Sequence, residues 1–195
     1  MNARTTTLQR YTKEVEIDLE LNVDGTGEAR IETGLAFLDH MLGSLAKHAR
    51  FDLTLRAKGD VHVDDHHTVE DTAIALGRAL AQVLADRSGI ARFGYAFAPL
   101  DEALARSVVD FAGRPWPRVE LRLKRETIGD VATENLTHFL NSRAIEAGAS
   151  LHVNVLCGSN DHHKAEAAFK ATAIALRNAV KRDGAGVPST KGVLS

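Results

Sequence analysis

Apolar and polar residues in the first half of the chain follow the two periods that mark strands and helices. Apolar side chains at every second position predict strands, and apolar side chains at spacings of three and four predict helices. Asp24-Gly25-Thr26-Gly27 predicts a tight turn between the first two strands. In chain order we expect strands at 13–21 and 28–32, a helix at 35–48, a strand at 51–56 and a helix at 66–85.

The second half repeats this order of strands, helix, strand and helix. We expect strands at 95–98, 103–111 and 119–123, a helix at 133–147, a strand at 150–156 and a helix at 162–182. Only four prolines occur in the chain, and no flexible linker separates the halves. We therefore predict an α+β protein whose residues 1–195 form a single unit of two tandem repeats, at about 10–92 and 93–190.

One polar phrase occurs in both halves, as Asp-His-His-Thr-Val-Glu at 65–70 and Asp-His-His-Lys-Ala-Glu at 161–166. Residues four apart share a helix face, so His66 with Glu70, and His162 with Glu166, can each bind one cation. The second histidine of each phrase lies about 100° further round its helix and points elsewhere. Exposed polar residues at two helix starts are the alternative. Recurrence of the whole phrase favours metal ligands.

Two further histidines, His40 and His138, each lie in the earlier predicted helix of their own repeat. A lone histidine in such a helix is more often a hydrogen-bonded packing residue, but the matched placement in both repeats favours metal ligands. Adding them gives each metal an i,i+4 pair, one offset histidine and one lone histidine. One predicted set is His40, His67, His162 and Glu166, and the other is His66, Glu70, His138 and His163. Such nitrogen-rich sets suit Zn, Mn, Fe or Ni, and redox inertness favours Mn or Zn. Four ligands per metal leave positions open for a substrate.

Composition excludes several other classes of function. The net charge is −2, without a long block of like charge, which argues against nucleic-acid and membrane partners. A single cysteine, Cys157, excludes an internal disulfide and suits a reducing compartment. The polar N-terminus lacks the apolar core of a signal peptide, and the most apolar stretch, 72–85, is too short to span a bilayer. We expect a soluble, cytoplasmic protein.

Basic residues close to these positions suit a phosphate group. Lys170 lies four residues beyond Glu166 and continues the same helix face. Arg92 and Arg114 add guanidinium donors. The C-terminal segment, rich in turn residues, adds Ser189 and Lys191. Each of these residues alone is more typical of a solvated surface charge, but together they suit a substrate that carries a phosphate.

Four segments together resemble the imidazoleglycerol-phosphate dehydratase family of histidine biosynthesis. They are Leu-Asp-His-Met-Leu at 38–42, the two repeated histidine phrases, Phe-Ala-Gly-Arg-Pro at 111–115, and Pro-Ser-Thr-Lys-Gly-Val-Leu at 188–194. The resemblance implies a duplicated fold of the ribosomal-protein-S5 domain-2 type, with helices packed between two mixed β-sheets. It also implies a homo-oligomer of twenty-four subunits, with two Mn(II) ions per active site and ligands from neighbouring subunits. Ser44 stands where the family often has a glutamine that contacts the substrate.

The resemblance further implies dehydration of D-erythro-imidazoleglycerol phosphate to imidazole acetol phosphate plus water. The hydrogen to be removed is poorly acidic, so an imidazolate that expels the neighbouring hydroxide would first give a diazafulvene-like intermediate. The resemblance assigns removal of this proton to a positioned carboxylate, Glu14, whereas the sequence alone favours an exposed strand glutamate at this position. Besides Glu14, the implied catalytic residues are His67, Glu70, His163 and Glu166. Glu14 and His48 join Arg92, Arg114, Lys170, Ser189 and Lys191 as substrate-binding candidates.

Two other functions use similar residues. A dinuclear metallohydrolase acting on a small phosphate ester also needs histidines, carboxylates and basic residues, but it usually has a bridging carboxylate, and none is obvious here. A non-catalytic assembly held together by metal needs the histidines but not the phosphate donors.

Overall fold

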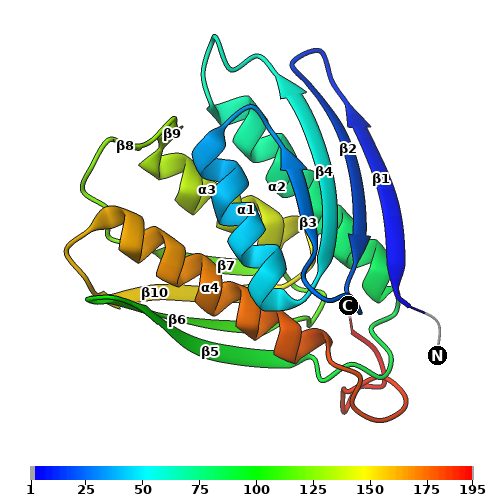
Figure 1. Ribbon diagram of the computed structural model, residues 1–195. Helices are drawn as coiled ribbons and strands as arrows, with labels where there is room; N and C mark the ends of the chain where they lie inside the picture. Colours follow the sequence, from blue (N-terminus) through cyan, green and yellow to red (C-terminus); the bar gives the residue numbers. More distant parts are fainter. Residues whose placement is uncertain (1–2, 195) are drawn as a thin grey trace.

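The computed structural model describes residues 3–194 and shows two four-stranded sheets with helices between them (Figure 1). The first sheet has the order β1 (Thr5–Tyr11), β2 (Val15–Asn22), β4 (Asp52–Gly59) and β3 (Ala29–Glu32). The second has the order β5 (Phe93–Leu100), β6 (Ala103–Asp110), β10 (Ser150–Cys157) and β7 (Trp116–Glu120).

The two sheets have the same connectivity. In each one, the first two strands form an antiparallel pair, and the strand after the first helix lies beside the second strand. The third strand of each repeat, β3 or β7, pairs in parallel at the far edge. These mixed sheets and the enclosed helices confirm the predicted fold class. The division at 10–92 and 93–190 stays a prediction.

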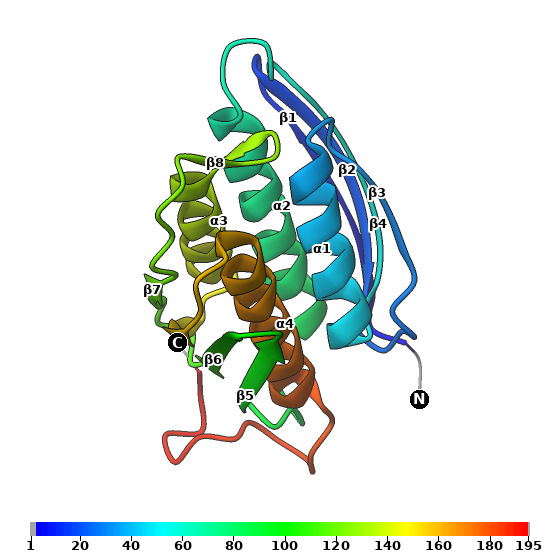
Figure 2. The same ribbon diagram turned by 60° about the vertical axis from the view of Figure 1, so that its left-hand side comes forward.

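Four helices fill the layer between the sheets (Figure 2): α1 (Ala36–Ala49), α2 (His66–Leu84), α3 (Thr133–Glu146) and α4 (Asp161–Val180). They pack in pairs that join the repeats, α1 against α4 and α2 against α3. Alternate residues of β2, such as Val15 and Ile17, are fully buried against this layer, and burial of apolar area supplies the main stabilisation. None of the helices within residues 3–194 is long and apolar enough to cross a membrane.

Three strand predictions differ from the structure. We predicted no strand before residue 13, but β1 forms an edge in which only Leu8 is buried, so its apolar signal is weak. The strand predicted at 119–123 lies at Trp116–Glu120, because pairing with β10 decides its position. The short strands β8 (Thr127–Ile128) and β9 (Val131–Ala132) form a hairpin that we did not predict.

The β8–β9 hairpin has no counterpart among the described residues of the first repeat, where only residues 33–35 separate β3 from α1. Its turn places Asp130 at the start of α1, where the carboxylate accepts hydrogen bonds from the amides of Ala36 (2.5 Å) and Phe37 (3.0 Å). The amide of Ala132 donates to Asp65 beside the start of α2 (2.9 Å). The two bonds to Asp130 satisfy the first amides of α1, a helix of the other repeat, and the bond to Asp65 joins the hairpin to the start of α2.

Gly94 allows the closest approach of β5 to α4. A Cβ atom there would overlap the carbonyl oxygen of Ala175 and lie 2.8 Å from the amide nitrogen of Ala179. We expect Gly94→Ala to lower the free energy of unfolding by roughly 1–3 kcal/mol, the usual cost of overpacking. Urea unfolding measures this change. Gly43→Ala is the control, since a Cβ atom at Gly43 on α1 meets nothing within 4 Å and should not destabilise the protein.

Candidate metal centres and substrate site

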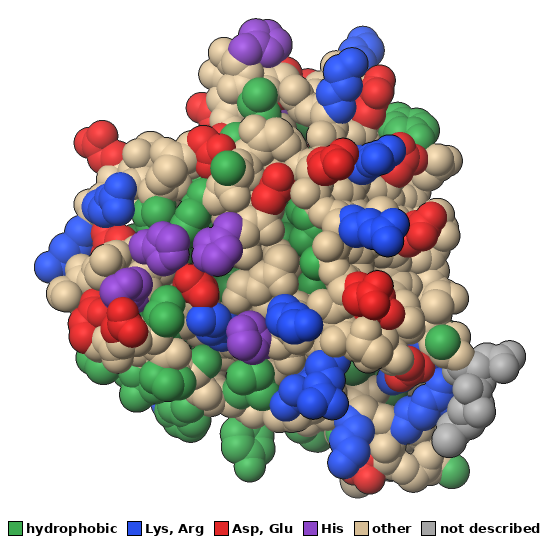
Figure 3. Space-filling view, in the orientation of Figure 1, with side chains coloured by type: hydrophobic (Ala, Val, Ile, Leu, Met, Phe, Trp, Pro, Cys, Tyr) green, Lys and Arg blue, Asp and Glu red, His purple; other side chains and the backbone are tan. Residues whose placement is uncertain are grey.

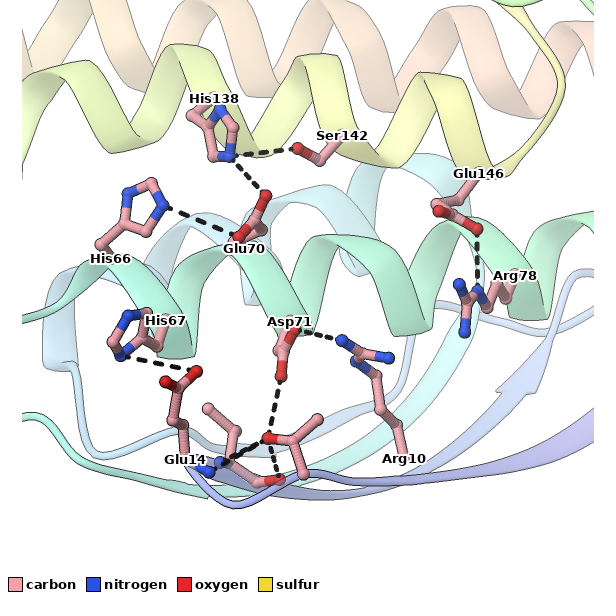
Figure 4. A network of polar contacts seen from close by, with 12 residues as sticks. Arg10, Glu14, His66, His67, Glu70, Asp71, Arg78, His138, Ser142 and Glu146 are labelled. Carbon is pink, nitrogen blue, oxygen red and sulfur yellow. Dashed lines mark hydrogen bonds and ion pairs between the residues drawn. The ribbon is translucent and has the colours of Figure 1, made fainter.

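The first candidate metal centre lies between α2 and α3. His66 and Glu70, one turn apart on α2, point toward His138 of α3 (Figure 4). The Nε2 atom of His138 lies 2.9 Å from Glu70, and His66 stacks on His138 with ring centroids 5.0 Å apart. The side-chain oxygen of Asn135 lies 3.0 Å from Nδ1 of His66. This contact places the proton on Nδ1 and leaves the Nε2 lone pair facing Glu70.

The second centre lies between α1 and α4 and has the same composition. The Nε2 atoms of His40 and His162 each lie 3.2 Å from one oxygen of Glu166, and Lys170 binds the other oxygen at 2.7 Å. Burial alone would raise the pKa of Glu166, but hydrogen bonds from Lys170 and His40 outweigh it and lower this pKa to about 2. The carboxylate is therefore ionised at neutral pH, as a metal ligand must be.

Both groups fit a divalent transition metal. In each, two imidazole nitrogens and one carboxylate oxygen lie within 4.8 Å of one another. Ligand atoms held about 2.1 Å from a common ion are roughly 3–4 Å apart, so small side-chain rotations suffice. Imidazole together with carboxylate is a donor set that Mn, Fe, Zn and Ni accept. Each group offers three protein ligands and leaves room for others.

The second histidine of each repeated phrase lies outside these groups. His67 points away from Glu70 and His138, toward Glu14 (Figure 4). Its Nδ1 atom lies 3.1 Å from Asp60, and Nδ1 of His163 lies 2.7 Å from Glu102. These hydrogen bonds raise the pKa of both imidazoles. The chain therefore gathers three of the four residues predicted for each metal and presents the fourth elsewhere.

Glu14 lies in the turn between β1 and β2, one residue before the start of β2. The turn is tied to α2 because Asp71 accepts a hydrogen bond from Arg10 (2.6 Å) and a longer one from Thr12 (3.4 Å). The Thr12 hydroxyl in turn accepts from the amide of Glu14. The Glu14 carboxylate is left 3.9 Å from His67 and largely exposed, at 55%. Sequence reasoning placed Glu14 within a strand and did not find Asp71.

The basic candidates fall into separate places. Lys170 lies at the second centre, close to His48, whose pKa is lowered by burial and by the charge of Lys170. Arg92 lies at the C-terminal end of α4, where it forms a double ion pair with Asp110 and donates to the carbonyl of Pro188. Nine residues of α4 separate Lys170 from that end, about 13 Å along its axis. One chain therefore does not gather all the predicted phosphate donors.

The remaining candidates lie, like Arg92, at the end of the second sheet where β5 and β7 begin. Ser189 follows Pro188 directly, and its hydroxyl accepts from the amide of Lys191 at 3.2 Å. Arg114 lies in the exposed segment before β7, and its carbonyl accepts from Ser150. Figure 3 shows the wider face, on which histidines gather over the helix layer with acidic and basic side chains beside them.

A model of the imidazoleglycerol-phosphate dehydratase family matches residues 33–176. The chain belongs to this family. An imidazoleglycerol-phosphate dehydratase of Gluconacetobacter diazotrophicus is 50% identical over 195 residues, which cover 98% of each protein. One of Phytophthora nicotianae is 55% identical over 193 residues, which cover 98% of this chain but 43% of that relative.

A solved structure supports the same assignment. The imidazoleglycerol-phosphate dehydratase of Staphylococcus aureus matches with a TM-score of 0.83 and 34% identity, over 91% of this chain and 99% of that one. The family assignment confirms the resemblance found in the sequence. It also confirms that the chain is an enzyme of the hydro-lyase class, because the relatives are named as dehydratases.

Proposed function

We propose that the chain catalyses the dehydration of imidazoleglycerol phosphate to imidazole acetol phosphate in histidine biosynthesis. The observation that carries this proposal is the pair of matched three-donor groups, one on each helix pair that joins the repeats. We propose that each group holds one Mn(II) ion. When bound, such ions act as Lewis acids and as a template for the imidazole ring of the substrate.

The side chains of the chain then have distinct tasks. Basic residues bind the phosphate and so orient the carbons that react. After the hydroxyl beside the ring has left, the hydrogen on the adjacent carbon becomes acidic, and we propose that the Glu14 carboxylate removes it. The hydroxyl and this hydrogen together leave as water, and the resulting enol tautomerises to the ketone. Exposure of Glu14 at 55% leaves its carboxylate accessible to a substrate.

We further propose that the sites are completed in a homo-oligomer of twenty-four subunits, with His67 and His163 supplied by neighbouring copies. An apolar sheet face supports association. Phe93, Tyr95 and Phe97 on the outer face of β5 are 57%, 71% and 59% exposed, and contiguous apolar surface marks protein contacts. Hydrophobic side chains project from the lower margin of Figure 3, where Figure 1 places β5. The corresponding face of β1, the equivalent edge strand of the first repeat, carries the polar residues Thr5, Thr7 and Gln9.

A dinuclear phosphate-ester hydrolase fits less well. Its two ions usually lie about 3.5–4 Å apart and clamp one reacting group. Within residues 3–194, the two donor groups share no residue that could bridge such ions.

One assay tests the proposal against its alternatives. The Mn-loaded protein is incubated separately with imidazoleglycerol phosphate and with p-nitrophenyl phosphate. We expect imidazole acetol phosphate from the first and no release of nitrophenol from the second. Nitrophenol release would favour the hydrolase, and a protein that assembles with metal but converts neither compound would favour the structural role.

Arg114→Ala tests the phosphate-binding assignment. Loss of a charge-assisted hydrogen bond should weaken substrate binding by roughly 1.5–3 kcal/mol, a rise in KM of about 10- to 150-fold. Metal content should not change. Arg118→Ala is the control, because Arg118 is 66% exposed and its ion pair is with Glu120 of its own strand. Equal inhibition of wild type and Arg114→Ala by inorganic phosphate would contradict the assignment.

A further inference from the structure

Carboxylates of their own repeats hold the two histidines that lie outside the donor groups. His163 is bound by Glu102 at 2.7 Å and His67 by Asp60 at 3.1 Å, and in both the ring nitrogen involved is Nδ1. Neither Nε2 atom forms a hydrogen bond within residues 3–194, and the contact of His163 Nε2 with Asp101 is 3.7 Å long. Each ring therefore presents Nε2 outward.

Glu102 and Glu14 occupy equivalent positions in the two repeats. Glu14 directly precedes β2, and Glu102 directly precedes β6. The next residues, Val15 and Ala103, are both 1% exposed and begin the inward-facing positions of their strands. The duplicated fold thus places a glutamate at both turns, each beside the second histidine of its own repeat.

The two glutamates differ in what their carboxylates bind. One oxygen of Glu102 accepts hydrogen bonds from the amides of Ser159 (2.9 Å) and Asn160 (2.7 Å), and the other oxygen holds His163. The Glu14 carboxylate forms no hydrogen bond within residues 3–194, and it lies 3.9 Å from His67. Glu102 is therefore engaged at both oxygens, whereas Glu14 is available.

The loops before α2 and α4 explain this difference. Residues 60–65 before α2 include Asp60, which holds His67. Residues 158–160 before α4 are Gly-Ser-Asn and contain no carboxylate, so the glutamate of the neighbouring turn takes this place.

We propose that Glu102 is a positioning residue, which keeps the proton of His163 on Nδ1 and directs Nε2 to a metal held by a neighbouring copy. Asp60 has the same role for His67. Because Asp60, and not Glu14, holds the histidine of the first repeat, the Glu14 carboxylate stays able to transfer a proton. The inference rests on the proposed metal sites. Hydrogen bonds of this kind fix the tautomer and the orientation of ligating histidines.

Glu102→Gln separates this role from a purely structural one. The glutamine oxygen still accepts from Ser159 and Asn160, but its NH₂ group faces Nδ1 of His163 and favours the tautomer with the proton on Nε2, which cannot bind a metal through Nε2. In competition with a chelating dye, we expect Mn affinity at one of the two sites per chain to fall 10- to 100-fold, and the other to stay unchanged. Excess Mn should restore turnover in Glu102→Gln, whereas it should not in Glu14→Gln.

Asp101→Asn is the matched control, since it removes a neighbouring carboxylate that makes no hydrogen bond to His163. Asp60→Asn should weaken the other site and so tests the inference independently. If wild type binds no Mn, the proposed function itself fails. If wild type binds two ions and both Glu102→Gln and Asp60→Asn bind two with unchanged affinities, only the positioning role is wrong.

Discussion

Glu14→Gln is expected to lower turnover by about 10²–10⁴, the contribution of a positioned general base. This loss corresponds to about 2.7–5.4 kcal/mol in the activation free energy. Glutamine keeps the shape of the side chain, so metal content and substrate affinity should survive. The defect should therefore appear in kcat at saturating substrate and not in KM.

Glu16→Gln is the control for this result, because Glu16 is an exposed glutamate of β2, two residues further along the chain. It should behave as wild type. A Glu14→Gln protein with near-normal kcat would return Glu14 to an exposed turn residue. The base would then be a metal-bound water or a histidine, with His48 beside Lys170 the next candidate.

Removal of metal is expected to abolish both activity and the large assembly. In the proposed assembly, a histidine of a neighbouring copy completes each three-donor group, because the corresponding histidine of the same chain points elsewhere. The free energy of metal binding would then stabilise the contact between copies. Chelation should release smaller oligomers, with trimers as the expected unit, and added Mn should restore the particle and the activity. Light scattering with parallel metal analysis measures this.

His67→Ala should reproduce part of this behaviour without a chelator, because it removes one of the proposed bridging ligands. His62→Ala is its control, since His62 is an exposed histidine of the same loop region and belongs to neither donor group. An unchanged particle after verified removal of metal would contradict the claim that metals join the subunits.

The fold was predictable where a strand or helix buries one regular face. In β2, the alternation of Val15, Ile17 and Leu19 with charged residues marks a half-buried strand, and α1 shows the matching helical period. In β1 only Leu8 is buried, so the strand has no alternation of apolar and polar residues by which it could be predicted. The position of β7 is set by its pairing with β10, a contact between distant segments that local patterns do not contain.

Part of the candidate site was predictable for the same local reason. His66 and Glu70 share a helix face because they are four residues apart, whatever the rest of the fold does. The approach of His138 to Glu70 depends on how α2 and α3 pack, and only the matched placement of histidines in the repeats suggested it. Asp60 and Glu102 come from loops and turns. Glu102 could have been found from its position, because it directly precedes the second strand of its repeat, as Glu14 does in the first repeat.

The β8–β9 hairpin also affects how the protein folds. Its Asp130 supplies the hydrogen-bond acceptor for the first amides of α1, so a helix of the first repeat is capped by a residue of the second. A severed first half would start α1 with unpaired amides and an uncovered apolar face. Although the two repeats have the same order of strands and helices, this cap ties the first repeat to the second, and we expect the chain to unfold in one cooperative transition.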